Sequence, residues 1–175
     1  MNKAFFLDRD GVVNEVIKKK LKPYPPKNIK EFKFCRGIKK FIDKYKKNYK
    51  IFVFTNQPDF KRGKITKSCI NNINNHVIKK LKIDELVCCF HDDNDNCSCR
   101  KPKIGMLNYL KKKYSLNMRQ SFVIGDRWSD ILCGQKAGCK TIYIDRCYNE
   151  KKPKNYNFKF KNISSLIKGL NEKKI

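Results

Sequence analysis

The sequence predicts an α/β protein, a three-layer sandwich built around a central parallel sheet. Short apolar runs that end in polar residues alternate with segments whose apolar residues recur at helical spacing. The apolar runs are continuous rather than alternating, which is typical of parallel strands covered by helices on both faces. The expected strands are residues 3–8, 49–57, 85–91, 121–126 and 140–145.

Helical patterns occupy the intervals between these strands. Residues 37–47 carry a single apolar stripe at helical spacing, and residues 66–82 begin at Thr66, whose hydroxyl suits a helix N-cap. The Pro- and Lys-rich segment 18–33 is expected to be a loop or a short hairpin. The remaining expected segments are helices at 104–115, 129–139 and about 163–173, and an exposed connection at 148–157.

Chain length and hydropathy bound the class of protein. The 175 residues form one domain, 1–175, that is large enough to bury a substantial core. The sequence contains no apolar run of the roughly 18 residues needed for a transmembrane helix. The apolar stretch near the N-terminus is too short for a signal peptide, so we expect a cytoplasmic protein.

The formal net charge of +26 suggests a polyanionic partner, but the composition offers another explanation. Nearly all the cations are lysines, spread along the chain together with abundant asparagine and isoleucine, as an A/T-rich genome would produce. We therefore expect a solvated basic surface that attracts a phosphorylated small molecule. Neither nucleic acid nor a membrane is the expected partner, and we expect a monomer.

Polar residues close four of the expected strands. Because ligands of such sheets bind at the carboxyl ends of the strands, these residues are expected to share one site. They are Asp8 and Asp10, Thr55 and Asn56, Arg100 and Lys101, and Asp126 and Asp130. Each motif alone has a plain alternative: a turn or a calcium-like loop, a Thr-Asn turn, a chance basic pair, or an acidic helix N-terminus.

The chemistry of this set favours phosphoryl transfer. Carboxylates of Asp8, Asp10 and Asp126 are oxygen ligands of the kind that Mg²⁺ prefers. A carboxylate can attack phosphorus, and a second acid can protonate the leaving alkoxide and then deprotonate water. Thr55, Asn56 and the cations Arg100 and Lys101 can hold a phosphoryl group.

Taken in order, the motifs Asp-x-Asp-Gly, Thr-Asn, Lys-Pro and Gly-Asp-x-x-x-Asp resemble those of the haloacid dehalogenase superfamily of phosphotransferases. The resemblance extends from Phe5 to Asp145 and implies a Rossmann-like sandwich. It implies Asp8 as nucleophile, Asp10 as acid and base, Thr55 and Lys101 as phosphoryl stabilisers, and Asp126 as the third magnesium carboxylate. Candidate substrate contacts are Arg9, Asn56, Gln57, Arg62, Arg100 and Arg127.

The segment 88–102 holds four of the nine cysteines and one of the two histidines. Three thiolates and an imidazole suit a closed, structural tetrahedral Zn²⁺ site. A redox role is less favoured because no Cys-x-x-Cys opens a helix here, and chance buried cysteines would not flank an acidic, exposed stretch. Side chains alternate along a strand, which favours Cys89 over Cys88 as first ligand. The expected ligands are Cys89, His91, Cys97 and Cys99.

This loop and the motifs "FLDRDGVVNE", "TNQ", "RGK", "CRKPKIGML" and "VIGDRWSDI" resemble the branch of heptose bisphosphate and histidinol-phosphate phosphatases. The resemblance implies Mg²⁺- and Zn²⁺-containing phosphatases without a large cap domain, and removal of the 7-phosphate of D-glycero-D-manno-heptose 1,7-bisphosphate. The chain departs from that pattern by lacking a Gly-Tyr pair after the first motif and a glycine after "TNQ". It also has Arg127 where lysine is frequent. Histidinol phosphate, a nucleic-acid 3′-phosphate and a non-catalytic zinc-bearing nucleic-acid binder remain alternatives.

Overall fold

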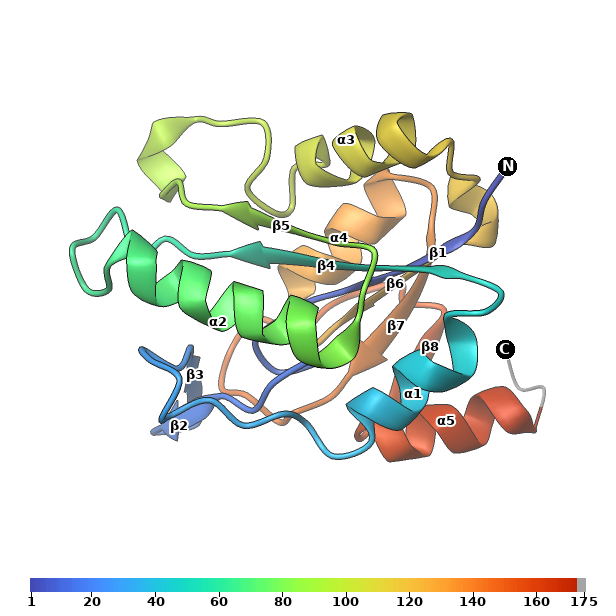
Figure 1. Cartoon of the computed structure of the whole chain (residues 1–175), viewed down its shortest axis with the longest axis horizontal. Helices are drawn as coiled ribbons and strands as arrows, with labels where there is room; N and C mark the ends of the chain where they lie inside the picture. The colour runs from blue at the N-terminus through green and yellow to red at the C-terminus, as the bar shows by residue number, and fades with distance from the viewer. Residues whose placement is uncertain (173–175) are drawn as a thin grey trace.

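Buried apolar strands form the middle layer of the protein (Figure 1). In the computed structural model, which describes residues 1–172, a six-stranded sheet has the order β5-β4-β1-β6-β7-β8, and neighbouring strands are parallel. The α/β sandwich expected from the sequence is therefore confirmed. The strands are β1 (Ala4–Leu7), β4 (Lys50–Asn56), β5 (Glu85–Cys89), β6 (Phe122–Gly125), β7 (Lys140–Ile144) and β8 (Phe158–Phe160).

Five of these strands match the expected apolar runs to within two residues at each end. The sixth, β8, lies just after the segment expected to be an exposed connection. It has only three residues, with an exposed lysine between two half-buried phenylalanines, and it pairs with β7 at the sheet edge. A strand this short gives no recognisable periodicity in the sequence.

Helices cover both faces of the sheet. Alternate residues of β1 divide between the two cores: Phe5 and Leu7 pack on one face, whereas Ala4 and Phe6 pack on the other. The first face is covered by α1 (Ile38–Tyr45), α2 (Lys67–Leu81) and α5 (Ile163–Asn171), and the second by α3 (Gly105–Tyr114) and α4 (Trp128–Lys136). Two short 3₁₀ helices are η1 (Asp93–Asp95) and η2 (Met118–Gln120).

The helix boundaries follow local chemistry. The Thr66 hydroxyl accepts a hydrogen bond of 3.2 Å from the backbone N–H of Cys69, so the expected N-cap of α2 is confirmed. The helix α5 begins after Asn162, whose side chain accepts from the N–H of Ser165 at 2.8 Å. The expected end of this helix, residue 173, lies outside the described residues.

A two-stranded hairpin interrupts the connection between β1 and α1. Its strands β2 (Ile17–Lys19) and β3 (Lys22–Tyr24) are antiparallel, and both turn residues have left-handed φ angles, 49° at Lys20 and 60° at Leu21. The hairpin rests on residues 146–149: Lys18 Nζ donates to the carbonyl of Arg146, and the N–H of Asn149 donates to that of Leu21, both at 3.1 Å. Of the two expectations for this segment, the structure selects the hairpin.

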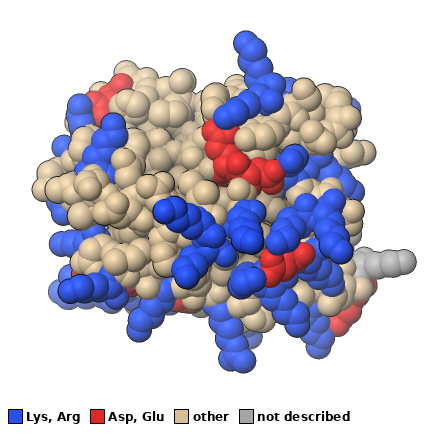
Figure 2. All heavy atoms as spheres, in the orientation of Figure 1, with Lys and Arg blue, Asp and Glu red and all other residues tan. Residues whose placement is uncertain are grey.

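The basic residues are dispersed over the face drawn in Figure 2, with acidic side chains between them. Several are tied locally, as at Asp43, which pairs with Lys39 at 2.7 Å and Lys46 at 2.8 Å. This face therefore shows a distributed charge, in line with the compositional interpretation. None of the helices within residues 1–172 is long and apolar enough to cross a membrane.

Candidate active site

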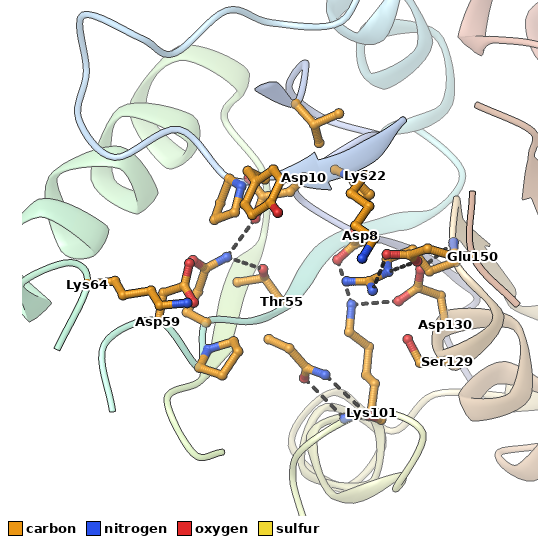
Figure 3. A pocket seen from close by; sticks show the side chains of 18 of the residues that line it. Asp8, Asp10, Lys22, Thr55, Asp59, Lys64, Lys101, Ser129, Asp130 and Glu150 are labelled. Atoms are coloured by element: carbon orange, nitrogen blue, oxygen red, sulfur yellow. Dashed lines mark hydrogen bonds and ion pairs between the residues drawn. The ribbon is translucent and has the colours of Figure 1, made fainter. Parts of the chain in front are cut away.

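The carboxyl ends of β1, β4 and β6 open into one cavity of about 260 Å³ (Figure 3). Strand β1 lies between β4 and β6, so residues that follow these three strands meet at one edge of the sheet. The hairpin at 22–24 and the loop after β4, at 58–64, form two walls of the cavity. The sequence-predicted residues that line it are Asp8, Asp10, Thr55, Asn56, Gln57, Arg62, Lys101, Arg127 and Asp130.

Lys101 is the cation at the bottom of this cavity. Its Nζ lies 2.5 Å from Asp8 Oδ1 and 2.7 Å from Asp130 Oδ1, and all three side chains are buried. Asn56 holds the lysine backbone in place, because its amide donates to the Lys101 carbonyl at 3.2 Å and accepts from the Lys101 N–H at 3.1 Å. The end of β4 thus positions a lysine that comes from the loop after β5.

Carboxylates outnumber cations in this buried cluster. Oxygens of Asp8, Asp126 and Asp130 lie within 4.8 Å of one another, against the single ammonium of Lys101. Burial raises the pKa of Asp8 to about 7; Lys101 opposes the rise, and Asp130 and Asp10 add to it. Burial would lower the pKa of Lys101, but the charges of Asp130 and Asp8 outweigh it and raise the pKa.

Asp126 carries a further mark of a cation site. Its Oδ2 accepts a hydrogen bond of 2.7 Å from Tyr148, while its Oδ1 is buried and has no hydrogen-bond partner among residues 1–172. Burial, followed by the charges of Asp8 and Asp130, raises the pKa of Asp126 well above its usual value. An orphaned carboxylate oxygen beside two other carboxylates fits a hard divalent cation such as Mg²⁺.

The side chain of Asp10 lies apart from this cluster. Three donors hold its carboxylate: Arg9 at 2.9 Å, Gln57 at 2.6 Å and Asn14 at 3.0 Å. The carboxylates that lie together are those of Asp8, Asp126 and Asp130, and the expected magnesium set of Asp8, Asp10 and Asp126 stays a prediction. The chain turns at Arg9, and the Asp10 side chain accepts from Gln57, which also donates to Thr55.

Arg9 lies beside Asp10 and is hydrogen-bonded to its carboxylate. It is fully buried and lies outside the lining of the cavity, with its guanidinium on Asp10 and on Asn74 Oδ1 at 2.8 Å. The expected contact of Arg9 with substrate stays a prediction, while the structure places its guanidinium on Asp10 and Asn74. The sequence shows only that Arg9 lies between Asp8 and Asp10, which is compatible with a contact to substrate and with a hydrogen bond to Asp10.

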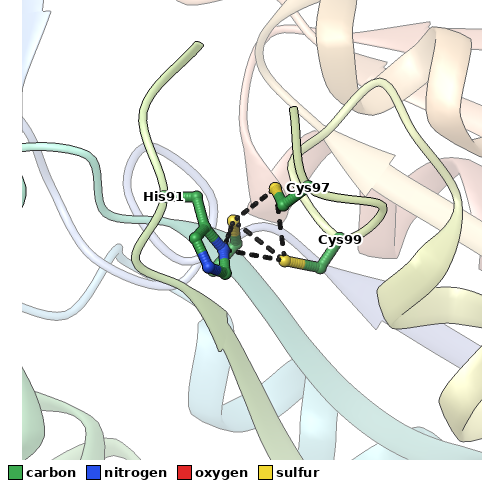
Figure 4. A group of neighbouring side chains, drawn as sticks. His91, Cys97 and Cys99 are labelled. Carbon is green, nitrogen blue, oxygen red and sulfur yellow. Dashed lines mark hydrogen bonds between the residues drawn. The ribbon is translucent and has the colours of Figure 1, made fainter. Parts of the chain in front are cut away.

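A second cluster joins β5 to the loop that follows it (Figure 4). The ligand atoms of Cys89, His91, Cys97 and Cys99 lie within 4.8 Å of one another, with Sγ–Sγ distances of 3.2 to 3.8 Å. A tetrahedral Zn²⁺ with Zn–S bonds of about 2.3 Å separates its sulfurs by about 3.8 Å. Cys89 and His91 share one side of the chain, as expected, and Cys88 occupies the alternate position.

Acidic residues of this loop form ion pairs with two of the arginines that were predicted to contact substrate, Arg62 and Arg100. Arg62 donates to Asp92 at 2.7 and 2.5 Å, and Arg100 donates to Asp93 at 2.8 Å. Arg100 is outside the cavity lining, whereas Arg62 contributes to it. The Arg62 pair joins the loop after β4 to the cysteine loop, whereas the Arg100 pair lies within the cysteine loop itself.

The comparisons with known proteins agree with this geometry. Residues 3–166 match the family model described as polynucleotide kinase 3 phosphatase. The chain belongs to this family. Within it, the chain is 37% identical to the D-glycero-alpha-D-manno-heptose-1,7-bisphosphate 7-phosphatase of Campylobacter jejuni subsp. jejuni, over 99% of this chain and 98% of the relative. It is 34% identical to the D-glycero-beta-D-manno-heptose-1,7-bisphosphate 7-phosphatase of Helicobacter pylori, over 79% and 81% of the two chains.

A solved structure shares the fold over nearly the full length of both chains. The D,D-heptose 1,7-bisphosphate phosphatase from B. bronchiseptica, complexed with magnesium and phosphate, superposes with a TM-score of 0.82 at 23% identity. The match covers 98% of this chain and 99% of the other. The phosphatase fold of the haloacid dehalogenase type, expected from the order of the motifs, is confirmed.

In this member of the phosphatase family, the cavity is also lined by residues that the sequence did not reveal. Lys22 and Tyr24 reach the cavity from the hairpin, and Asp59, Lys64 and Glu150 reach it from two loops. Glu150 holds Arg127 through hydrogen bonds of 2.9 and 2.8 Å. Lys64 belongs to the "RGK" segment and could have been selected from it, but no sequence signal separates Lys22 from its many lysine neighbours.

Gly11 allows the loops after β1 and β6 to meet. Its φ is +105°, and a Cβ built there would lie 1.7 Å from Asp126 Oδ2. We expect Gly11→Ala to lower the free energy of unfolding by about 1–3 kcal/mol more than Gly138→Ala, because steric overlap adds to backbone strain. Gly138 is the matched control, with φ +77° and nothing in the described chain within 4 Å. Urea unfolding measures both, and equal losses would contradict the close approach.

Proposed function

We propose that this chain is a Mg²⁺-dependent phosphatase that removes the 7-phosphate of D-glycero-D-manno-heptose 1,7-bisphosphate. The observation that carries the proposal is the buried contact of Asp8 with Lys101 beside the orphaned carboxylate oxygen of Asp126. The names of the two relatives above support the substrate. Because one relative is named for the α anomer and the other for the β anomer, both anomers belong in the test.

In the first half of the reaction, a carboxylate oxygen of Asp8 attacks phosphorus, and the bond from phosphorus to the sugar oxygen breaks. Asp10, at the cavity edge, supplies the proton that the departing alkoxide requires. An aspartyl-phosphate remains on Asp8, where the buried ammonium of Lys101 offsets its negative charge. Mg²⁺, when bound by the carboxylates of the cluster, neutralises the repulsion between the phosphoryl oxygens and Asp8.

In the second half, Asp10 takes a proton from water, which attacks phosphorus and releases inorganic phosphate and free Asp8. The buried hydroxyl of Thr55 lines the cavity and is positioned by Gln57, which donates to it at 2.8 Å. Gln57 also donates to Asp10, so one amide sets the separation between the acid and base residue and the hydroxyl. Thr55 thereby provides a hydrogen bond to a phosphoryl oxygen.

The cations around the cavity support a substrate with two phosphates. Arg62 and Arg127 face acidic partners, Asp92 and Glu150, whereas Lys22 and Lys64 form no ion pair within the described part of the chain. In Figure 3 Lys22 points toward the group around Asp8, and Lys64 lies across the cavity beside Asp59. We propose that Lys64 meets the second phosphate, far from the reacting one.

The substrate assignment is tested by phosphate release with Mg²⁺ from both anomers of the heptose bisphosphate, from histidinol phosphate and from 3′-phosphorylated oligonucleotides. We expect the heptose bisphosphate to have the highest kcat/KM, and Asp8→Asn to abolish turnover while the thermal unfolding transition is kept. Preference for an oligonucleotide, as the family description would suggest, replaces the sugar assignment. Substantial turnover by Asp8→Asn refutes the nucleophile.

Lys64→Met is expected to raise the KM for heptose 1,7-bisphosphate about tenfold, because one charge-assisted contact to the second phosphate is lost. The KM for a heptose 7-phosphate monoester should change less than twofold. Lys61→Met is the matched control: Lys61 lies in the same loop but pairs with Asp95 outside the cavity lining. Equal effects on both substrates would contradict a second-phosphate contact at Lys64.

We further propose that Cys89, His91, Cys97 and Cys99 bind one structural Zn²⁺. Three thiolates and an imidazole fill a tetrahedral shell, so the ion would hold the loop rather than take part in the reaction. The loop ends at Arg100 and Lys101, and its ion pair with Arg62 reaches the opposite wall. Thiolate ligands require a reducing compartment, which supports a cytoplasmic location.

Elemental analysis of protein purified without chelators is expected to find about one zinc per chain. Cys89→Ser should lose the zinc and lower the thermal stability, because metal binding contributes directly to folding. Cys88→Ser, which changes the neighbouring thiol on the alternate face of β5, should keep the zinc. Zinc retained by both variants, or a stable wild-type protein without zinc, would overturn this ligand set.

A further inference from the structure

The segment 145–150, which follows β7, contacts the loops after β1 and β6 and the hairpin. Arg146 Nε donates to the carbonyl of Gly11 at 2.8 Å, in the loop after β1. Tyr148 donates to Asp126 at 2.7 Å, after β6. Glu150 accepts a hydrogen bond from Arg127, and the N–H of Asn149 donates to the carbonyl of Leu21 in the hairpin. The sequence predicted an exposed connection from residue 148, but Tyr148 is only 6% exposed.

Tyr148 decides which oxygen of Asp126 is available. Its hydroxyl occupies Oδ2, and the same oxygen packs so closely on Gly11 that no side chain fits between them. The other oxygen, Oδ1, is buried without a partner in residues 1–172. Rotation of the Asp126 carboxylate would break the hydrogen bond from Tyr148 to Oδ2. Both carboxylate oxygens would then be buried without a hydrogen bond, which is unfavourable.

The phenol is suited to act only as a donor. Its hydroxyl donates to Oδ2 of Asp126 at 2.7 Å, and the tyrosine side chain is buried. Residues that hold a metal-binding carboxylate in this way orient the ligand and strengthen metal binding. The hydroxyl also satisfies one of the buried acids without adding a positive charge that would compete with a cation.

We propose that Tyr148 is a positioning residue for the metal site: its hydrogen bond to Oδ2 of Asp126 leaves the buried Oδ1 free for a divalent cation held between Asp126 and Asp8. The inference rests on the proposed metal-dependent function. It assigns to the loop after β7 a part in metal affinity, in addition to its packing against the hairpin and the loop after β1.

Mg²⁺ binding to the full chain, measured by titration calorimetry in the absence of substrate, tests this role. We expect Tyr148→Phe to raise the Kd for Mg²⁺ by about 10–100-fold. Tyr143→Phe is the matched control, since Tyr143 is also a buried tyrosine whose hydroxyl donates to an aspartate, Asp145, at 3.1 Å. It should leave the Kd within twofold of wild type. A Tyr148→Phe Kd within twofold of wild type overturns the proposal.

Kinetics separate positioning from a general structural effect. Tyr148→Phe should raise the Mg²⁺ concentration for half-maximal turnover while kcat at saturating Mg²⁺ stays within about threefold, because excess cation compensates for weak binding. A fall in kcat that added Mg²⁺ does not restore would contradict the proposal. If the variant does not fold, the wild-type protein gives the answer by NMR: the Tyr148 hydroxyl proton should remain hydrogen-bonded at saturating Mg²⁺, and its loss would overturn the role.

The variant Asp126→Asn tests the proposed metal site separately from the role of Tyr148. If Asp126→Asn binds Mg²⁺ as tightly as wild type, the proposed metal site is wrong, and the inference about Tyr148 is refuted with it. If Asp126→Asn abolishes binding and Tyr148→Phe leaves it unchanged, the metal site stands and only the role of Tyr148 is refuted. Neither outcome depends on which phosphate ester is the substrate.

Discussion

The arrangement of the catalytic edge depends on a concentration of buried negative charge. Asp8, Asp126 and Asp130 meet at the ends of β1 and β6 around the single ammonium of Lys101. Such a cluster is unfavourable without compensation, because carboxylates taken out of water lose their hydration and repel one another. The raised pKa values of Asp8 and Asp126 express this cost. A divalent cation is the natural partner of a site with this charge.

Other parts of the structure hold that cluster together. Asn56 ties Lys101 to the end of β4, and Tyr148 ties Asp126 to the loop after β7. Arg9 and Gln57 hold the Asp10 carboxylate apart from the three buried acids, in the lining of the cavity, where we propose that it transfers protons. An ion pair then connects the cysteine loop to the cavity wall, since Arg62 lines the cavity and donates to Asp92 of that loop. The side chains of Asn56, Tyr148 and Arg9 thus hold other side chains of the site in place.

Much of the fold could be predicted from the sequence because burial on two faces leaves a clear pattern. The strand at 50–56 is buried on both faces, and the apolar residues of α1 recur at helical spacing. Both elements are therefore recognisable from the local sequence. The strand β8 and the left-handed turn at Lys20 and Leu21 leave no such pattern. Both owe their conformation to partners distant in sequence, β7 and the 146–149 loop.

Sequence alone determined which residue types end the strands, and therefore that acids, a threonine and Lys101 would gather at one edge of the sheet. It also determined that Cys89 and His91 share a face, because side chains alternate along an extended chain. Only the tertiary structure decided that Asp130 rather than Asp10 joins the buried carboxylates, that Arg9 is buried behind Asp10, and that Tyr148 reaches Asp126. The reason is that the direction of a side chain beyond its own strand depends on hydrogen-bond partners brought from elsewhere in the chain, and no local pattern encodes them.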